Sequence, residues 1–161
     1  MEENRLTQQA EEQGVIDVIK EENGIDGLFA AVEDIEARVE RVDIVRDGNV
    51  FFGFDVQPLD SGTFDEIRDR NTPKKRNRAG VPIRQGIKLD DYMAEVIFTA
   101  TTSDDRQRLW LNPEVKKRLG AVGYQVIKRV LYAGELEEVY DFIEKISGYD
   151  NELNLGETVK N

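Results

Sequence analysis

The sequence predicts an α+β domain that is predominantly helical, with one β-hairpin at about residues 39–57 packed against about five helices. Three observations support this fold class. Apolar residues recur with a helical period over most of the chain, and the period changes to two on either side of the dipeptide Asp47-Gly48. The length of 161 residues suffices for one domain with loose ends, and the hydrophobic fraction of 39% indicates that those ends lie outside a smaller folded body.

The ends of the chain differ in composition from its middle. We expect a flexible acidic arm over residues 1–24, a single domain over residues 25–148 and a polar tail over residues 149–161. The first residues, "MEENRLTQQAEEQG", contain neither a basic segment nor an apolar run, so they do not resemble a signal peptide. No apolar run approaches the roughly 18 residues that span a membrane. We therefore expect a soluble cytoplasmic protein that does not bind membranes.

The first predicted elements of the domain are a helix and the hairpin. Asp26 can cap a helix through "GLFAAVEDIEA". In "VERVDIVRDGNVFFGFDVQPL", apolar and polar residues alternate on both sides of Asp47-Gly48, which is typical of a tight turn because glycine accepts a positive φ. Gly53 indicates a bulge or close packing in the second strand, and Pro58 ends that strand. The residues on one face of the first helix are Leu28, Phe29, Val32 and Ile35.

The rest of the domain is predicted to consist of short amphipathic helices. Ser61 or Thr63 would cap a helix in "DSGTFDEIRDRN", and Asp90 would cap the most apolar helix, "LDDYMAEVIFTATT". Asn112 is a good N-cap for "PEVKKRL", and Gly120 would stop that helix. The segments "GYQVIKRVLY" and "GELEEVYDFIEKISG" form the last two helices.

The last helix carries an apolar seam whose members are three, four and three residues apart. They are Leu136, Val139, Ile143 and Ile146. A seam of this kind is more often part of the core than part of an interface between chains. In the alternative interpretation, Leu136, Val139, Tyr140 and Ile143 bind a partner.

Trp110 is the only tryptophan of the chain. With no histidine, cysteine or phosphate-binding loop nearby, it has no evident chemistry to perform. Leu109, Leu111, Val115 and Leu119 can pack beside it. We therefore predict that Trp110 joins the middle helix to the C-terminal pair of helices, with a contact to a partner as the alternative.

Composition excludes several kinds of site. The chain has no histidine and no cysteine, which rules out Ser-His-Asp catalysis, thiolate chemistry and metal sites built from those residues. A net charge of −11 opposes general binding to phosphate backbones. Glycine motifs that cradle phosphates are absent from the sequence. We expect neither enzyme activity nor a cofactor.

Carboxylates cluster at Asp90-Asp91, at Asp104-Asp105 and over residues 135–138. Adjacent residues on a helix point in different directions, so these side chains do not converge by themselves. Metal ligation or paired acid–base catalysis would need a third group contributed by the fold. Helix capping and solvated helix faces explain the clusters more simply.

Residues 71–88, "NTPKKRNRAGVPIRQGIK", contain two prolines, two glycines and six basic residues without an acidic one, and they are predicted to form a loop. The loop has three interpretations. It contacts nucleic acid, it docks on an acidic protein such as a second copy of this chain, or it is solvated without a partner. The net negative charge argues against nucleic acid. The candidate partner-binding residues of the loop are Lys74, Lys75, Arg76 and Arg78.

The order of these segments resembles a known family. The hairpin is followed by the short helix "FDEIRDRNT", the apolar helix "DDYMAEVIFTATT" and a closing block. That block contains "VLYAGELEEVYDFIEKISGYD", which matches a closing L-x-x-G-E-x-x-x-L…I-x-x-x-S-G pattern. Over roughly residues 38–150 the sequence resembles the XkdN-like tail assembly chaperones of phages and prophages with contractile or flexible tails.

The resemblance implies a non-enzymatic helper of virion morphogenesis. Proteins of this family bind the long helical tape-measure protein and keep it soluble until tail-tube subunits polymerise around it. The implied partner is therefore the tape-measure protein, with tail-tube subunits and a second copy of the chain as further candidates. The implied location is the host bacterial cytoplasm, with the protein absent from the mature virion. A structural component of the tail or of the head–tail connector is the alternative function.

Many genes of this family also produce a longer protein by ribosomal frameshifting. A chain that ends in "GETVKN" would be the short form. An acidic helical protein with an apolar surface suits the implied role, because it can cover apolar helices of a partner while the complex stays soluble.

Overall fold

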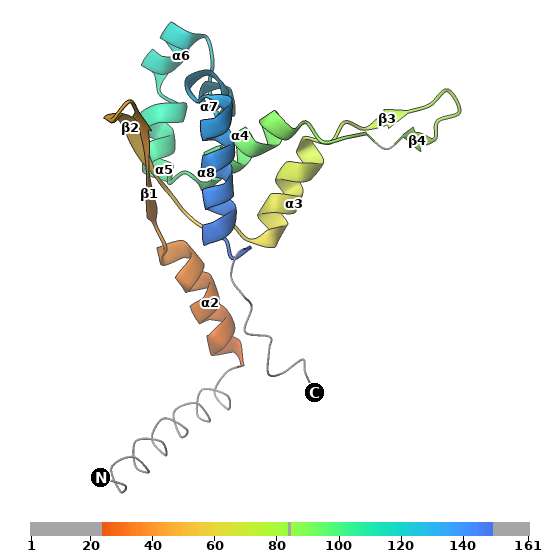
Figure 1. Cartoon of the computed structure of the whole chain (residues 1–161). Coiled ribbons are helices and arrows are strands. Elements are labelled where there is room, and N and C mark those ends of the chain that lie inside the picture. Colours follow the sequence, from red (N-terminus) through yellow and green to blue (C-terminus); the bar gives the residue numbers. More distant parts are fainter. Residues whose placement is uncertain (1–23, 84, 150–161) are drawn as a thin grey trace, which may run out of the picture. The chain divides into compact units, whose positions relative to one another are not determined.

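The computed structural model describes residues 24–83 and 85–149 (Figure 1). The chain divides into two units, residues 1–37 and residues 38–161. In the first unit the structure describes one helix, α2 (Ile25–Ala37), none of whose residues is buried.

The single domain expected over residues 25–148 stays a prediction. Helix α2 belongs to the first unit, and its apolar side chains are exposed. The expected arm over residues 1–24 and tail over residues 149–161 lie outside the described residues, apart from Gly24 and Tyr149.

The second unit begins with the β-hairpin that the sequence predicts. Strands β1 (Glu40–Arg46) and β2 (Asn49–Val56) pair antiparallel, with a shift in register between Ile44 and Val45. The turn residues Asp47 and Gly48 have positive φ angles of 50° and 77°. This geometry requires residues that tolerate the left-handed region, and an Asp-Gly pair suits it.

Gly53 is a point of close packing in β2, whereas the register shift lies elsewhere. A Cβ at this position would lie 2.1 Å from Asp43 Oδ1 and 2.9 Å from the backbone oxygen of Val42. The side chain of Asp43 can move, but the strand backbone cannot move without breaking the pairing. Position 53 therefore requires glycine because a Cβ has no space there, and not because of its φ angle.

We expect Gly53→Ala to lower the free energy of unfolding by about 1–3 kcal/mol, as overpacking of a tight site does. Urea denaturation followed by circular dichroism measures the change. Gly134→Ala is the matched control, because nothing lies within 4 Å of a Cβ at that helical position. The control should be neutral or slightly stabilising, and equal losses in the two variants would contradict the packing explanation.

The remaining elements are mostly helical, which confirms the predicted fold class. In chain order they are α3 (Ser61–Arg70), β3 (Lys75–Arg76), β4 (Pro82–Ile83), α4 (Leu89–Ala100), α5 (Ser103–Asp105), the π-helical turn η1 (Arg106–Trp110), α6 (Pro113–Leu119), α7 (Tyr124–Val130) and α8 (Ala133–Ile146).

Three of the predicted helix caps are wrong. Helix α2 begins at Ile25, so Asp26 lies inside its first turn. Asp60, rather than Ser61 or Thr63, caps α3, because its extended backbone places Oδ1 2.7 Å from the Thr63 amide. Helix α4 begins at Leu89, so Asp90 lies inside its first turn, where a negative charge still favours the helix N-terminus.

The cap predicted for α6 is confirmed. Asn112 Oδ1 accepts a hydrogen bond of 2.9 Å from the Glu114 amide, and Gly120 ends the helix in the left-handed region. The side chain of Asn112 therefore satisfies one of the amides that a helix N-terminus leaves unpaired.

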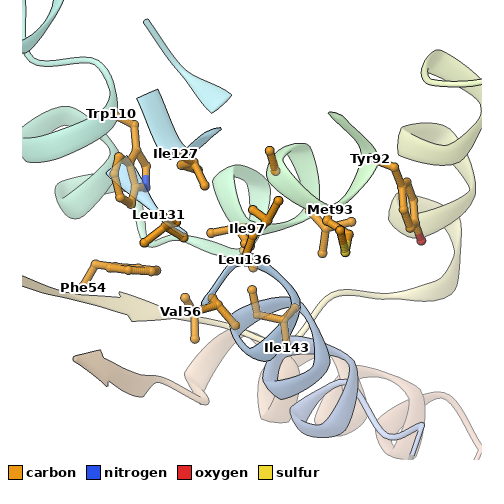
Figure 2. Close-up of a cluster of buried hydrophobic side chains, with 14 of the residues drawn as sticks. Phe54, Val56, Tyr92, Met93, Ile97, Trp110, Ile127, Leu131, Leu136 and Ile143 are labelled. Carbon is orange, nitrogen blue, oxygen red and sulfur yellow. The ribbon is translucent and has the colours of Figure 1, made fainter. Parts of the chain in front are cut away.

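Helix α4 lies at the centre of the core and packs against α3, α7 and α8. Figure 2 shows side chains of β2, α4, η1, α7 and α8 converging on one cluster. The seam of α8 belongs to this cluster, and Ile143 is fully buried. The buried members of α4 are Tyr92, Met93, Ala94, Val96, Ile97 and Ala100.

The hairpin is joined to the helices at the end of α4. Thr101 forms an antiparallel bridge with Val56, and the Gln57 amide donates to the Ala100 carbonyl at 2.8 Å. The Thr102 amide donates to the Asp55 carbonyl at 2.9 Å. The chain after α4 thus acts as a short third strand beside β2, which leaves the outer edge of β1 open.

Trp110 is buried, with 2% of its surface exposed, and it ends η1 just before α6. Its ring packs edge-on against Phe54 and Phe52, with centroids 5.2 and 6.1 Å away. Its Nε1–H donates to Thr101 Oγ1 at 3.0 Å. The tryptophan therefore joins the helices to the β-hairpin, a contact that the sequence does not predict.

Candidate interaction surfaces

The carboxylate clusters do not form a catalytic or metal site in the described part of the chain. Residues 24–83 and 85–149 contain no group of three or more acidic side chains that could hold a metal ion. Asp91 instead accepts from Lys128 Nζ at 2.5 Å. Asp105 accepts from the Asp55 amide at 2.7 Å and from Arg108 Nε at 2.9 Å. These carboxylates connect segments of the fold.

The pKa of Asp105 reflects this structural role. Burial raises the pKa of its carboxyl, but hydrogen bonds from Arg108 and from the Asp55 amide outweigh burial and lower the pKa below the usual 3.8. The pKa of Glu135 is likewise lowered, chiefly by its hydrogen bonds with Arg46. A carboxyl with a lowered pKa stabilises the fold above its unfolded pKa, and that contribution is lost as the pH falls through the folded pKa.

We expect the protein to lose stability as the pH falls below about 4, the usual range of these carboxyls. Asp105→Asn should lower the free energy of unfolding by about 1 kcal/mol at pH 7. The substitution should also reduce the further loss of unfolding free energy between pH 5 and pH 2.5, because the variant has one fewer carboxylate to protonate. Thermal unfolding across this pH range measures both effects, and an acid-induced loss equal to that of the wild type would contradict the role of Asp105.

The basic residues predicted to contact a partner lie on an exposed hairpin within the segment predicted as a loop. Strands β3 and β4 pair Lys75 with Ile83 and Arg76 with Pro82. At the base of this segment, the Lys88 amide donates to the carbonyl of Asn71 at 2.9 Å. We call residues 74–83 the basic arm. All of its residues, including Lys74, Lys75, Arg76 and Arg78, are exposed.

The candidate partner-binding residues of the last helix are in a different environment. Leu136, Val139 and Ile143 are buried in the core of the protein and present almost no surface to a partner. Tyr140 is partly buried, and its hydroxyl donates to Glu144 at 2.5 Å. The structure thus separates the basic candidates, which are exposed, from the apolar candidates, which fill the core.

Helix α2 carries the apolar stripe that the sequence predicts on one face of the first helix. Large apolar residues recur three or four positions apart along the helix, and their exposed fractions range from 38% to 69%. The helix also contains four acidic residues and no basic one. We call this feature the α2 stripe: Ile25, Leu28, Phe29, Val32 and Ile35.

A groove of about 370 Å³ lies between β1 and α8. Residues 41–45 of β1 form one wall, and one face of α8 forms the other. The α8 residues are Glu135, Glu138, Val139 and Phe142.

Arg46 fixes β1 to the start of α8 beside this groove. Its guanidinium donates to both carboxylate oxygens of Glu135, at 2.7 and 2.6 Å, and to the Val130 carbonyl at 2.7 Å. It also lies 4.2 Å from the centroid of the Tyr132 ring. A bidentate arginine–carboxylate pair is geometrically specific, so the two walls of the groove are held in register.

The sequence matches a known protein family. The family model of the phage XkdN-like tail assembly chaperone proteins matches residues 27–160. The chain belongs to this family. The family resemblance inferred from the sequence is thereby confirmed, and the match includes most of α2 as well as the second unit.

As a tail assembly chaperone, the protein interacts with phage tail proteins during assembly. Its family is a chaperone family and not an enzyme family. None of the helices in the described ranges combines the length and the hydropathy that a membrane span needs.

No curated protein matches the chaperone sequence. Among solved structures, the crystal structure of the protein yqbn, a structural genomics target, is similar to it. The two sequences are 18% identical, the match covers 70% of this chain and 87% of that one, and the TM-score is 0.43.

Proposed function

We propose that this chaperone binds the tape-measure protein non-covalently and keeps it soluble in the host cytoplasm until the tail tube forms around it. The observation that carries the proposal is the α2 stripe. Five large apolar side chains on one 13-residue helix are exposed in the isolated chain. An amphipathic helix with anchors three and four residues apart is a common means of binding another helix.

The charge of α2 indicates the kind of helix that it binds. Asp26, Glu33 and Asp34 occupy the sides of the helix away from the stripe, and the helix has no basic residue to balance them. A partner helix with basic residues beside an apolar face would be complementary to it. The same acidic surface would keep the complex soluble once the apolar faces are covered.

The direct test is co-expression with the tape-measure gene of the same genome. The soluble fraction of the tape-measure protein should increase several-fold when the chaperone is present. An equally insoluble tape-measure protein in both cases would refute the proposal. Mass spectrometry of purified particles is a second test, because a chaperone that leaves before maturation is absent from them and a structural tail component is present.

A further inference from the structure

The basic arm has an unpaired strand edge, and its charge is positive whereas the net charge of the chain is negative. Asn77 pairs with Val81, since its amide donates to the Val81 carbonyl and its side-chain oxygen accepts from the Val81 amide, both at 2.9 Å. In an antiparallel ladder, hydrogen-bonded and non-hydrogen-bonded pairs alternate. The neighbouring pair of Arg76 with Pro82 is therefore non-hydrogen-bonded, consistent with proline lacking an N–H. The backbone groups of Arg76 consequently point away from β4.

The arm also presents apolar side chains next to its positive charges. Val81 and Ile83 are 53% and 45% exposed. The loop between the two strands is ordered by Asn77, whose side chain also accepts from the Ala79 amide at 2.9 Å. The arm is thus a preformed hairpin that combines an open edge, two apolar side chains and a cluster of cations.

The open edge of β1 is a complementary acceptor. Asp55 directs its amide to Asp105 and its carbonyl to Thr102, so its backbone points away from β1. Its pairing partner, Arg41, must then point its own N–H and C=O away from β2.

The same reasoning applies two residues further along β1. The carbonyl of Gly53 accepts from Arg108 at 2.9 Å, so the backbone of its pairing partner Asp43 also faces outward. Among the described residues, neither Arg41 nor Asp43 has a backbone hydrogen bond on that side. The groove between β1 and α8 is therefore bordered by an unpaired strand edge.

The distribution of charge along the chain indicates which segment binds in the groove. The segment 71–88 contains six of the 22 basic residues of the chain and none of its 33 acidic residues, so the remainder of the molecule is strongly negative. Within the groove, Glu138 is exposed and has no ion pair in the described part of the chain. A second copy of the protein thus supplies, in its arm, a hairpin that matches the groove in backbone and in charge.

We propose that the basic arm of one copy binds in the groove of a second copy, with β3 adding to the open edge of β1. The backbone groups of Arg76 pair with those of Arg41 and Asp43. The side chain of Arg76 lies near Glu138, and Val81 and Ile83, which project from the opposite face of the arm, lie outside the groove. The contact is heterologous, because the arm and the groove are different surfaces, so each copy can bind two others.

The absence of native cysteine permits a site-specific test. Full-length Arg76→Cys protein is mixed with full-length Glu138→Cys protein at micromolar concentration and treated with a short bismaleimide. We expect a cross-linked dimer that contains both variants, at several-fold higher yield than when Arg76→Cys is mixed with Lys117→Cys. Lys117 is an exposed position on α6, outside the groove.

Equal yields with Glu138→Cys and Lys117→Cys would overturn the proposal. The proposal would also be overturned if a chain carrying both Arg76→Cys and Glu138→Cys cross-linked only intramolecularly at every concentration. The groove would then bind the arm of its own chain. Neither outcome depends on tape-measure binding, so the proposed function is tested separately.

Charge exchange gives an independent measurement. In sedimentation velocity at low salt, Lys75→Glu/Arg76→Glu should weaken self-association about tenfold, since opposed charges at a contact raise its dissociation constant. Glu138→Lys should weaken self-association in the same direction. A mixture of the two variants should recover association, because the altered arm then meets an altered groove. Wild-type protein that stays monomeric up to high micromolar concentration would also overturn the proposal.

Discussion

Trp110→Ala is expected to lower the free energy of unfolding by about 3–5 kcal/mol, which is the cost of truncating a buried aromatic side chain. The indole is 2% exposed and contacts Phe54 and Phe52 of the hairpin. Removing it leaves a cavity between the hairpin and η1, and it also removes the hydrogen bond to Thr101. Because a domain of this size is stable by only about 5–15 kcal/mol, the loss is severe.

Trp110→Phe separates the two contributions of the side chain. Phenylalanine retains much of the ring packing but cannot donate to Thr101 Oγ1, so we expect a smaller loss of about 1–2 kcal/mol. Urea denaturation of both variants, followed by far-ultraviolet circular dichroism, measures the difference. A Trp110→Ala protein with wild-type stability would show that the indole does not join the two parts of the fold.

Leu28→Gln/Phe29→Gln is expected to abolish the gain in tape-measure solubility while leaving the unfolding temperature of the second unit unchanged. Both side chains are more than 60% exposed, so replacing them removes no core packing. Glutamine is a good helix former, so α2 is preserved. Each large apolar side chain that a partner fully buries contributes about 1.5–3 kcal/mol, so losing two weakens binding more than a hundredfold.

Ala30→Gln is the matched control for this variant. Its helical position lies away from the α2 stripe, and alanine at that position is exposed. Co-expression with Ala30→Gln should retain wild-type solubility of the tape-measure protein. If the double variant supports solubility as well as this control does, then α2 is not the binding surface.

Much of the fold follows from local rules that the sequence carries. The hairpin follows from alternation around an Asp-Gly turn, because only residues that accept a positive φ fit that turn. The start and the stop of α6 follow from Asn112 and Gly120 in the same way. The seam of α8 follows from spacing alone, although spacing does not show whether a seam meets the core or a partner.

Other features depend on residues far apart in the sequence. Arg46 and Glu135 are 89 positions apart, and nothing in either local segment indicates that they pair. Trp110 contacts the hairpin because the chain after α4 returns beside β2, which periodicity cannot show. The caps of α3 and α4 were misplaced because several neighbouring polar residues can each serve as a cap, and the backbone conformation decides which one does.

The sequence by itself determined the helical α+β class, the hairpin, the exclusion of histidine and cysteine chemistry, and the resemblance to tail assembly chaperones. These follow from residue types and from short spacings. Only the tertiary structure decided which apolar surfaces are buried in the core and which stay exposed. It buried Leu136, Val139 and Ile143, and it left the α2 stripe and the edge of β1 open. An amphipathic face has the same pattern in both cases, because burial depends on what the rest of the chain places against it.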